Sequence, residues 1–137
     1  MSKVTGHLLV VDDNKVNRLL LGRGLEQQGH TVEFAENGIQ ALEALNAGEF
    51  DLILLDIEMP EMDGYQVLEN ITADYHLRHI PVIMTTALDE LDSVVKCIEM
   101  GAEDYLTKPV NPVLLRARIN ASLEKKRLRD EQRELIR

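Results

Sequence analysis

Short apolar runs alternate with longer segments of helical periodicity along most of this 137-residue chain. Some runs, such as Leu52–Leu55, are apolar on both faces, which is typical of a strand inside a parallel sheet. Since strand–helix–strand units cross over in a right-handed sense, the alternation predicts an α/β fold with one parallel sheet and helices on both faces. The predicted strands cover residues 7–11, 31–35, 51–56, 80–86 and 102–107.

Residues that favour helix ends bound the predicted helices. Asn37 and Asn111 are suited to cap helix starts, and Gly29, Gly48 and Gly101 are suited to end them. The predicted helices cover residues 15–28, 38–47, 65–73, 89–100 and the chain from 112 onwards. We expect three helical apolar sets: Val16, Leu19, Leu20 and Leu25 on one side of the first helix; Val67, Leu68 and Ile71 facing inward; and Leu115, Ile119 and Leu123 on the sheet.

Polar side chains follow four of the five predicted strands. Asp12 and Asp13 come after the first, Asp56 ends the third, Thr86 ends the fourth and Lys108 follows the fifth. The carboxyl ends of parallel strands meet at one edge of the sheet, which is where open α/β sheets carry their chemistry. The sequence therefore predicts that these five residues converge at that edge.

Three carboxylates at one edge are suited to a hard cation such as Mg²⁺, which prefers oxygen ligands and retains waters. We expect Asp13 and Asp56 to bind the ion directly, Asp12 to bind through a water, and the main-chain carbonyl of Glu58 to complete the site. Mn²⁺ would satisfy the same oxygen ligands. Without a cation, crowded carboxylates raise one another's pKa.

Asp56 is the best candidate for a nucleophile, because it ends a strand with a fixed carboxylate. Lys108 can pair with Asp56 and then with a phosphoryl oxygen, and Thr86 can offer its hydroxyl to another. Phosphoryl transfer depends mainly on positioning and charge neutralisation, and this set of residues supplies both.

Four segments of the chain resemble the receiver domain of response regulators, over about residues 5–123. The matching segments are Val10–Asn14, Asp56–Gly64, Met84–Ala87 and Gly101–Pro109.

This resemblance implies a flavodoxin-like strand order 2-1-3-4-5. It also implies that Asp56 accepts a phosphoryl group from a phosphohistidine of a sensor histidine kinase or a histidine phosphotransfer protein. Asp12 and Asp13 would be the acidic magnesium pair, Thr86 the switch hydroxyl and Tyr105 the switch aromatic, with Lys108 as the site's lysine. Glu58 and Leu88 fall at two positions that vary across the family and tune phosphoryl lifetime. Beyond self-phosphorylation and self-dephosphorylation, no enzyme activity is expected.

Two other classes of protein use similar parts. A haloacid-dehalogenase-like phosphatase needs a second Asp two residues after its nucleophile, where this chain has Glu58, and carries its acidic pair late in the chain. A flavodoxin-type electron carrier needs a hydroxyl- and glycine-rich phosphate loop after the first strand, where this chain has Asp12–Lys15. The first remains a remote alternative, and a colourless purified protein would exclude the second.

The net charge of −9 is unevenly distributed. Residues 1–115 hold 7 Lys and Arg against 20 Asp and Glu, which argues against direct binding of nucleic acid. No apolar run reaches the ~20 residues of a membrane span, and no signal segment follows the N-terminus, so we expect a cytoplasmic protein. The single cysteine, Cys97, is expected to be a buried apolar residue.

The last segment differs from the rest, with 8 Lys and Arg against 4 Asp and Glu in residues 116–137. We expect a receiver domain over residues 1–123 and a charged helical extension over residues 124–137. Ala121, Leu128 and Leu135 recur every seven residues, which is a weak coiled-coil pattern. The extension favours a receiver that is the input part of a longer regulator over a stand-alone receiver that binds a partner. A phosphorylation-dependent homodimer through the last helix is consistent with either arrangement.

Overall fold

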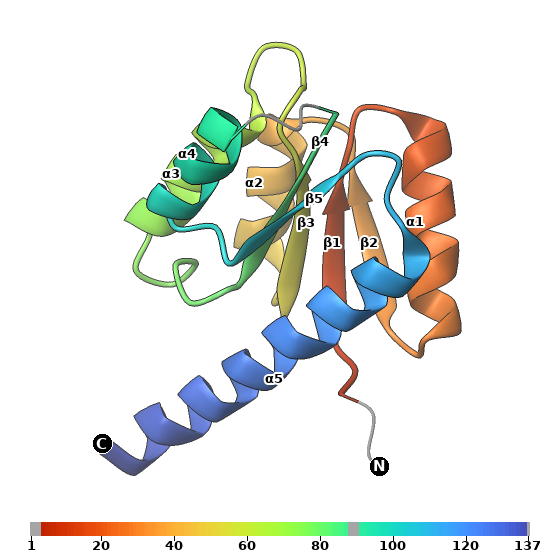
Figure 1. Cartoon of the computed structure of the whole chain (residues 1–137). Coiled ribbons are helices and arrows are strands. Elements are labelled where there is room, and N and C mark those ends of the chain that lie inside the picture. Colours follow the sequence, from red (N-terminus) through yellow and green to blue (C-terminus); the bar gives the residue numbers. More distant parts are fainter. Residues whose placement is uncertain (1–3, 88–90, 137) are drawn as a thin grey trace.

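A computed structural model describes residues 4–87 and 91–136 of the chain. Five parallel strands form one sheet, and five helices alternate with them (Figure 1). The strands are β1 (His7–Val11), β2 (Thr31–Ala35), β3 (Leu52–Asp56), β4 (Val82–Thr86) and β5 (Asp104–Thr107). The helices are α1 (Lys15–Gln27), α2 (Gly38–Ala47), α3 (Gly64–Ala73), α4 (Leu91–Glu99) and α5 (Pro112–Ile136). The predicted α/β class is confirmed.

The strand order is β2-β1-β3-β4-β5, as the resemblance implied. All four pairings are parallel, and Val11 lies beside Leu55 while Asp56 lies beside Thr85. Strands β1, β3 and β4 therefore end at nearly the same height. This register places the residues that follow them at one edge of the sheet.

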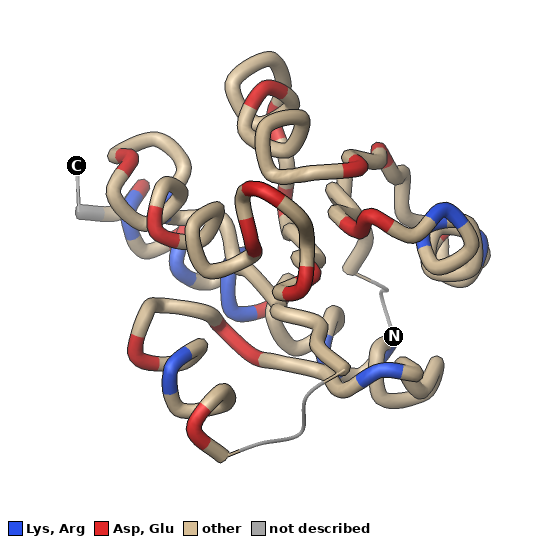
Figure 2. Tube along the Cα trace, turned by 90° about the horizontal axis from the view of Figure 1, so that it is seen from above, with Lys and Arg blue, Asp and Glu red and all other residues tan. Residues whose placement is uncertain are grey.

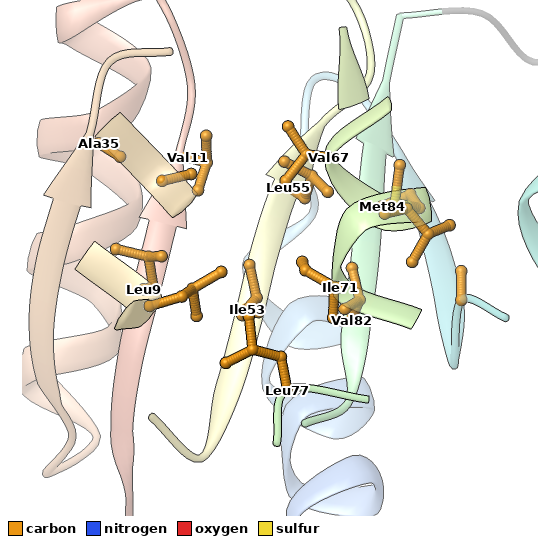
Figure 3. Packing of buried hydrophobic residues seen from close by; sticks show 14 of the residues in the cluster. Leu9, Val11, Ala35, Ile53, Leu55, Val67, Ile71, Leu77, Val82 and Met84 are labelled. Carbon is orange, nitrogen blue, oxygen red and sulfur yellow. The ribbon is translucent and has the colours of Figure 1, made fainter. Parts of the chain in front are cut away.

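The helices cover both faces of the sheet. Helices α2, α3 and α4 pack on one face, and α1 and α5 pack on the other (Figure 1). Because side chains alternate along a strand, Leu9 and Val11 point to the first face while Leu8 and Val10 point to the second. Figure 3 shows the first cluster, in which Ile53 and Leu55 of β3 meet Ile71 of α3. Each face of the sheet thus has its own apolar core.

Helix ends agree with the sequence in most places. The side chain of Asn37 caps α2 by accepting a hydrogen bond from the Gln40 N–H, and Asn111 accepts from two N–H groups at the start of α5. Gly29 and Gly101 follow α1 and α4 with φ of 97° and 105°, a region that favours glycine. Of the predicted helix 89–100, positions 89 and 90 lie outside the described residues, as does Leu88.

The inward faces were predicted correctly for α3 and α5, and less well for α1. Val67, Leu68 and Ile71 are buried, and so are Leu115, Ile119 and Leu123. Of the four apolar residues expected on one side of α1, only Leu25 is buried, whereas Val16, Leu19 and Leu20 are exposed. Cys97 is buried, as expected.

Helix α5 runs without a break through the predicted boundary at residue 123 and extends away from the sheet (Figure 1). Basic residues outnumber acidic ones along its length, whereas acidic residues outnumber basic ones in the rest of the molecule (Figure 2). Leu128 and Leu135 of the seven-residue repeat are exposed. Ion pairs hold the near part of the extension on the domain: Arg129 lies 3.1 Å from Glu103, and Lys126 lies 3.8 Å from Asp51.

Candidate functional site

Acidic residues and one lysine meet at the carboxyl edge of the sheet. Asp56 ends β3, Asp12 and Asp13 follow β1, and Lys108 follows β5. One carboxylate oxygen from each of the three aspartates lies within 4.8 Å of the other two. The Lys108 ammonium lies 3.0 Å from Asp56 Oδ1 and 3.2 Å from Asp12 Oδ2. The predicted convergence of these four residues is present in the structure.

Burial distinguishes the members of this acidic group. Asp12 and Asp56 are almost completely buried, whereas Asp13 is exposed. Asp12 Oδ1 accepts a hydrogen bond from the Asn14 N–H, and Asp56 Oδ1 accepts one from the Glu58 N–H. Asp56 Oδ2 is buried and accepts no hydrogen bond from any described residue. A buried, unpartnered carboxylate oxygen is costly unless something compensates it.

Burial raises the pKa of Asp56 to about 7, against an ordinary value of 3.8, although the Lys108 ammonium acts in the opposite direction. Burial also acts to lower the pKa of Lys108, but its contacts with Asp56 and Asp12 outweigh burial and raise it. Lys108 is therefore charged at neutral pH. One ammonium does not balance two buried carboxylates and an adjacent exposed one, so the site can accommodate a further cation.

Thr86 lies on the other side of the strand ends. Asp12, Asp56 and Lys108 continue the alternation of residues that face α1 and α5, whereas Thr86 continues that of Met84, which faces α3 and α4. The Thr86 hydroxyl donates a hydrogen bond of 2.7 Å to Glu58 Oε1. Thr86 is thus connected to the acidic group indirectly, by the hydrogen bonds of Glu58 in the loop that follows β3.

The contacts of the Glu58 side chain are the part of this site that sequence reasoning missed. Its main-chain carbonyl was expected as a metal ligand, and the resemblance placed Glu58 at a position that tunes phosphoryl lifetime, but no partner of its side chain was predicted. Its Oε1 accepts hydrogen bonds from the Thr86 hydroxyl and from the Ala87 N–H (2.8 Å). Although burial acts to raise the pKa of Glu58, these hydrogen bonds lower it, so the side chain is a carboxylate at neutral pH. The position of Glu58 two residues after the strand end was the only available signal.

Gly64 fixes the loop that carries Glu58. A Cβ at this position would lie 2.4 Å from the main-chain oxygen of Asp56 and 2.7 Å from Cα of Ile57. The Gly64 N–H also donates to the Ile57 carbonyl. Only glycine allows α3 to begin this close to the end of β3.

Comparison with known proteins identifies the family. The sequence model of the "Response regulator receiver domain" matches residues 8–120. The chain belongs to this family.

Two curated relatives and one solved structure illustrate the relationship. The receiver is 41% identical over 123 residues to a "Probable cyclic di-GMP phosphodiesterase" of Vibrio cholerae, covering 90% of this chain and 28% of that protein. It is 39% identical over 131 residues to the response regulator PleD of Caulobacter vibrioides, covering 96% and 29%. The signal receiver domain of a histidine kinase from Syntrophus aciditrophicus has a TM-score of 0.81 at 37% identity, covering 88% of this chain and 91% of that one. The chain thus spans under a third of the length of these two curated relatives.

Receiver domains are signalling phosphoacceptors of two-component systems, so the class of function predicted from the sequence is confirmed. The phosphatase and electron-carrier alternatives are set aside. Within the described residues, no helix has the length and apolar character needed to cross a membrane.

Tyr105 lies next to Met84 in the register of β4 and β5, on the sheet face to which Thr86 also belongs. It is half-buried and packs against the apolar cluster beneath α2, α3 and α4. Its side chain therefore lies on the same face of the sheet as Thr86, on the neighbouring strand.

Proposed function

We propose that Asp56 of this receiver accepts a phosphoryl group from a phosphohistidine of a sensor histidine kinase or a histidine phosphotransfer protein. The observation that carries this proposal is the buried Asp56 carboxylate, with an unpartnered Oδ2 beside Asp12, Asp13 and Lys108. In the reaction, an Asp56 oxygen bonds to phosphorus as the phosphorus–nitrogen bond breaks, and the histidine nitrogen retains the electron pair.

The donor set fits Mg²⁺, and Mn²⁺ has the same ligand preference. Asp13 and Asp56 would bind the ion directly, Asp12 through a water, and Glu58 through its main-chain carbonyl. When bound, the ion neutralises charge on the carboxylates and on an incoming phosphoryl group. The three carboxylates and the unpartnered Asp56 oxygen support this assignment.

Lys108 and the end of β4 would complete the site. The Lys108 ammonium already lies 3.0 Å from Asp56 Oδ1 and can follow a phosphoryl oxygen with little movement. The Thr86 hydroxyl and the Ala87 N–H are donors one residue apart, suited to a second phosphoryl oxygen. Once Thr86 turns toward Asp56, we expect Tyr105 to enter the vacated space, which alters the surface of α4, β5 and α5.

The phosphodonor needs access to Asp56 from outside. A groove of about 540 Å³ runs between α1 and the β5–α5 loop, and Asp12 and Lys108 are among the residues that line it. Leu20 also lines it, and Val16 and Leu19 are exposed on the same helix, α1. These exposed apolar residues support docking of a protein phosphodonor at α1, because a small phosphate donor would make no use of an apolar surface.

The charged extension supports an output partner C-terminal to the receiver. We propose a receiver domain up to residue 123 and a helical extension over residues 124–137 that connects it to the output part of a longer regulator. The phosphodiesterase among the relatives makes an enzymatic output a specific candidate. Residues Leu128 and Leu135 support a phosphorylation-dependent homodimer through α5. A stand-alone receiver that binds a separate partner remains the second candidate.

The test is labelling with acetyl phosphate and Mg²⁺, detected as a mass increase on the intact protein. The wild type should take up one phosphoryl group and lose it on treatment with mild base, to which an acyl phosphate is labile. Asp56→Asn should take up none, whereas Asp51→Asn, at the opposite end of β3, should behave as the wild type. Stoichiometric labelling of Asp56→Asn would rule out Asp56 as the acceptor.

A further inference from the structure

The side chain of Glu58 occupies the hydrogen-bond donors at the end of β4. Its Oε1 receives the Thr86 hydroxyl at 2.7 Å and the Ala87 N–H at 2.8 Å. Hydrogen bonds to a charged acceptor are about twice as strong as bonds between neutral groups. This contact joins the loop after β3 to the end of β4 across 28 residues of chain.

The same residue also contacts the acceptor. The Glu58 N–H donates to Asp56 Oδ1 at 3.2 Å, while the Glu58 side chain extends to Thr86. An anion attached to Asp56 would therefore compete with the Glu58 carboxylate for the same two donors. Two anionic oxygens that share these donors would also repel each other.

We propose that the Glu58 carboxylate is an internal competitor of the phosphoryl group, so that its release from Thr86 and Ala87 limits how tightly the site holds a phosphoryl group and begins the switch. This inference rests on the proposed function. The Glu58 carboxylate thereby stabilises the unphosphorylated arrangement of the β4 end relative to the phosphorylated one.

Burial explains how the contact can open. Glu58 is exposed, so its carboxylate can leave Thr86 and be hydrated at little cost. Thr86 is 1% exposed, so water has little access to its hydroxyl. A phosphoryl oxygen can replace the Glu58 carboxylate as the acceptor, and exchange of one anion for the other gives two discrete arrangements of the β4 end.

The experiment measures binding of beryllofluoride, a phosphoryl analogue, at saturating Mg²⁺ in Glu58→Gln, Glu58→Ala and the wild type. Removal of the competing charge should tighten binding about tenfold in Glu58→Gln, and at least as much in Glu58→Ala. Glu61→Gln is the matched control, since Glu61 is exposed in the same loop and its replacement removes the same charge. Its affinity should equal that of the wild type.

A second readout examines the free protein. The Ala87 amide proton should shift downfield in the wild type through its bond to the carboxylate, and should move upfield in Glu58→Ala before any ligand is added. Unchanged beryllofluoride affinity in both Glu58 variants, or an unchanged Ala87 resonance, would overturn this inference while leaving the phosphoacceptor proposal intact. Failure of the wild type to bind beryllofluoride at all would instead count against the proposed function.

Discussion

Replacement of Asp56 by Asn should stabilise the folded domain in metal-free buffer, and more so at alkaline pH. The acceptor carboxylate is buried, one of its oxygens has no partner among the described residues, and Asp12 lies beside it. Asn has nearly the same shape but no charge to desolvate. The variant therefore removes the cost of the charge and keeps the packing.

The magnitude follows from the pKa of Asp56, which burial raises from 3.8 to about 7. The unfolded chain ionises Asp56 at the lower value, whereas the folded protein retains the proton until about pH 7. Between pH 3.8 and about pH 7 the folded state binds more protons at Asp56 than the unfolded state does. The free energy of unfolding therefore falls as the pH rises through this range and stays low above pH 7. At about 1.4 kcal/mol per pKa unit, ionisation of Asp56 costs up to about 4 kcal/mol.

Urea denaturation with EDTA present, at about pH 5.5 and about pH 8, measures this cost. The advantage of Asp56→Asn over the wild type should widen by about 2 kcal/mol between the two values, because ionisation in the folded state is completed only near the second. A constant effect of the amide on packing cancels in this comparison. Addition of Mg²⁺ at the higher pH should stabilise the wild type more than the variant. An advantage that is equal at both pH values would refute the reasoning.

Two further variants test other parts of the structure. Gly64→Ala should lower the free energy of unfolding by about 1–3 kcal/mol and slow labelling with acetyl phosphate, because the added Cβ would press on the main chain of Asp56. Urea denaturation would measure the first effect and mass spectrometry the second. A variant as stable as the wild type would contradict the close approach of Gly64 to the main chain of Asp56. His30 is buried and accepts the Gly6 N–H through Nδ1, and burial lowers its pKa, so its contribution to stability is lost as the pH falls below its unfolded value of 6.5. In the Asp56→Asn background, His30→Gln should therefore reduce the loss of stability on acidification from about pH 7 to about pH 5, and an unchanged slope would show that His30 is not responsible.

The sequence was sufficient to predict the elements that carry the site, because each strand end was marked by a change from apolar to polar residues. Strand β1 and the caps Asn37 and Asn111 were predicted at the correct residues. The parallel register then brought Asp12, Asp56 and Lys108 together, although they are far apart in the chain. Such convergence follows from topology alone once the strand order is known.

The exposed side of α1 could not be predicted in the same way. Val16, Leu19 and Leu20 have helical spacing, but the sheet buries the side that carries Leu25 and Gly22 instead. Gly22 lies against the Phe34 ring, which a Cβ there would meet at 2.3 Å. Close approach through a glycine leaves no apolar signal in the sequence, so the pattern of large residues indicated the wrong side.

The site lies on both faces of one sheet, and this arrangement gives the Glu58 carboxylate its importance. Asp12, Asp56 and Lys108 belong to the face covered by α1 and α5, whereas Thr86 belongs to the face covered by α3 and α4. A change at Asp56 can pass around the carboxyl edge of the sheet, where Glu58 contacts Asp56 with its main chain and Thr86 with its side chain. The loop after β3 is therefore one route by which the charge state of the acceptor reaches the opposite face.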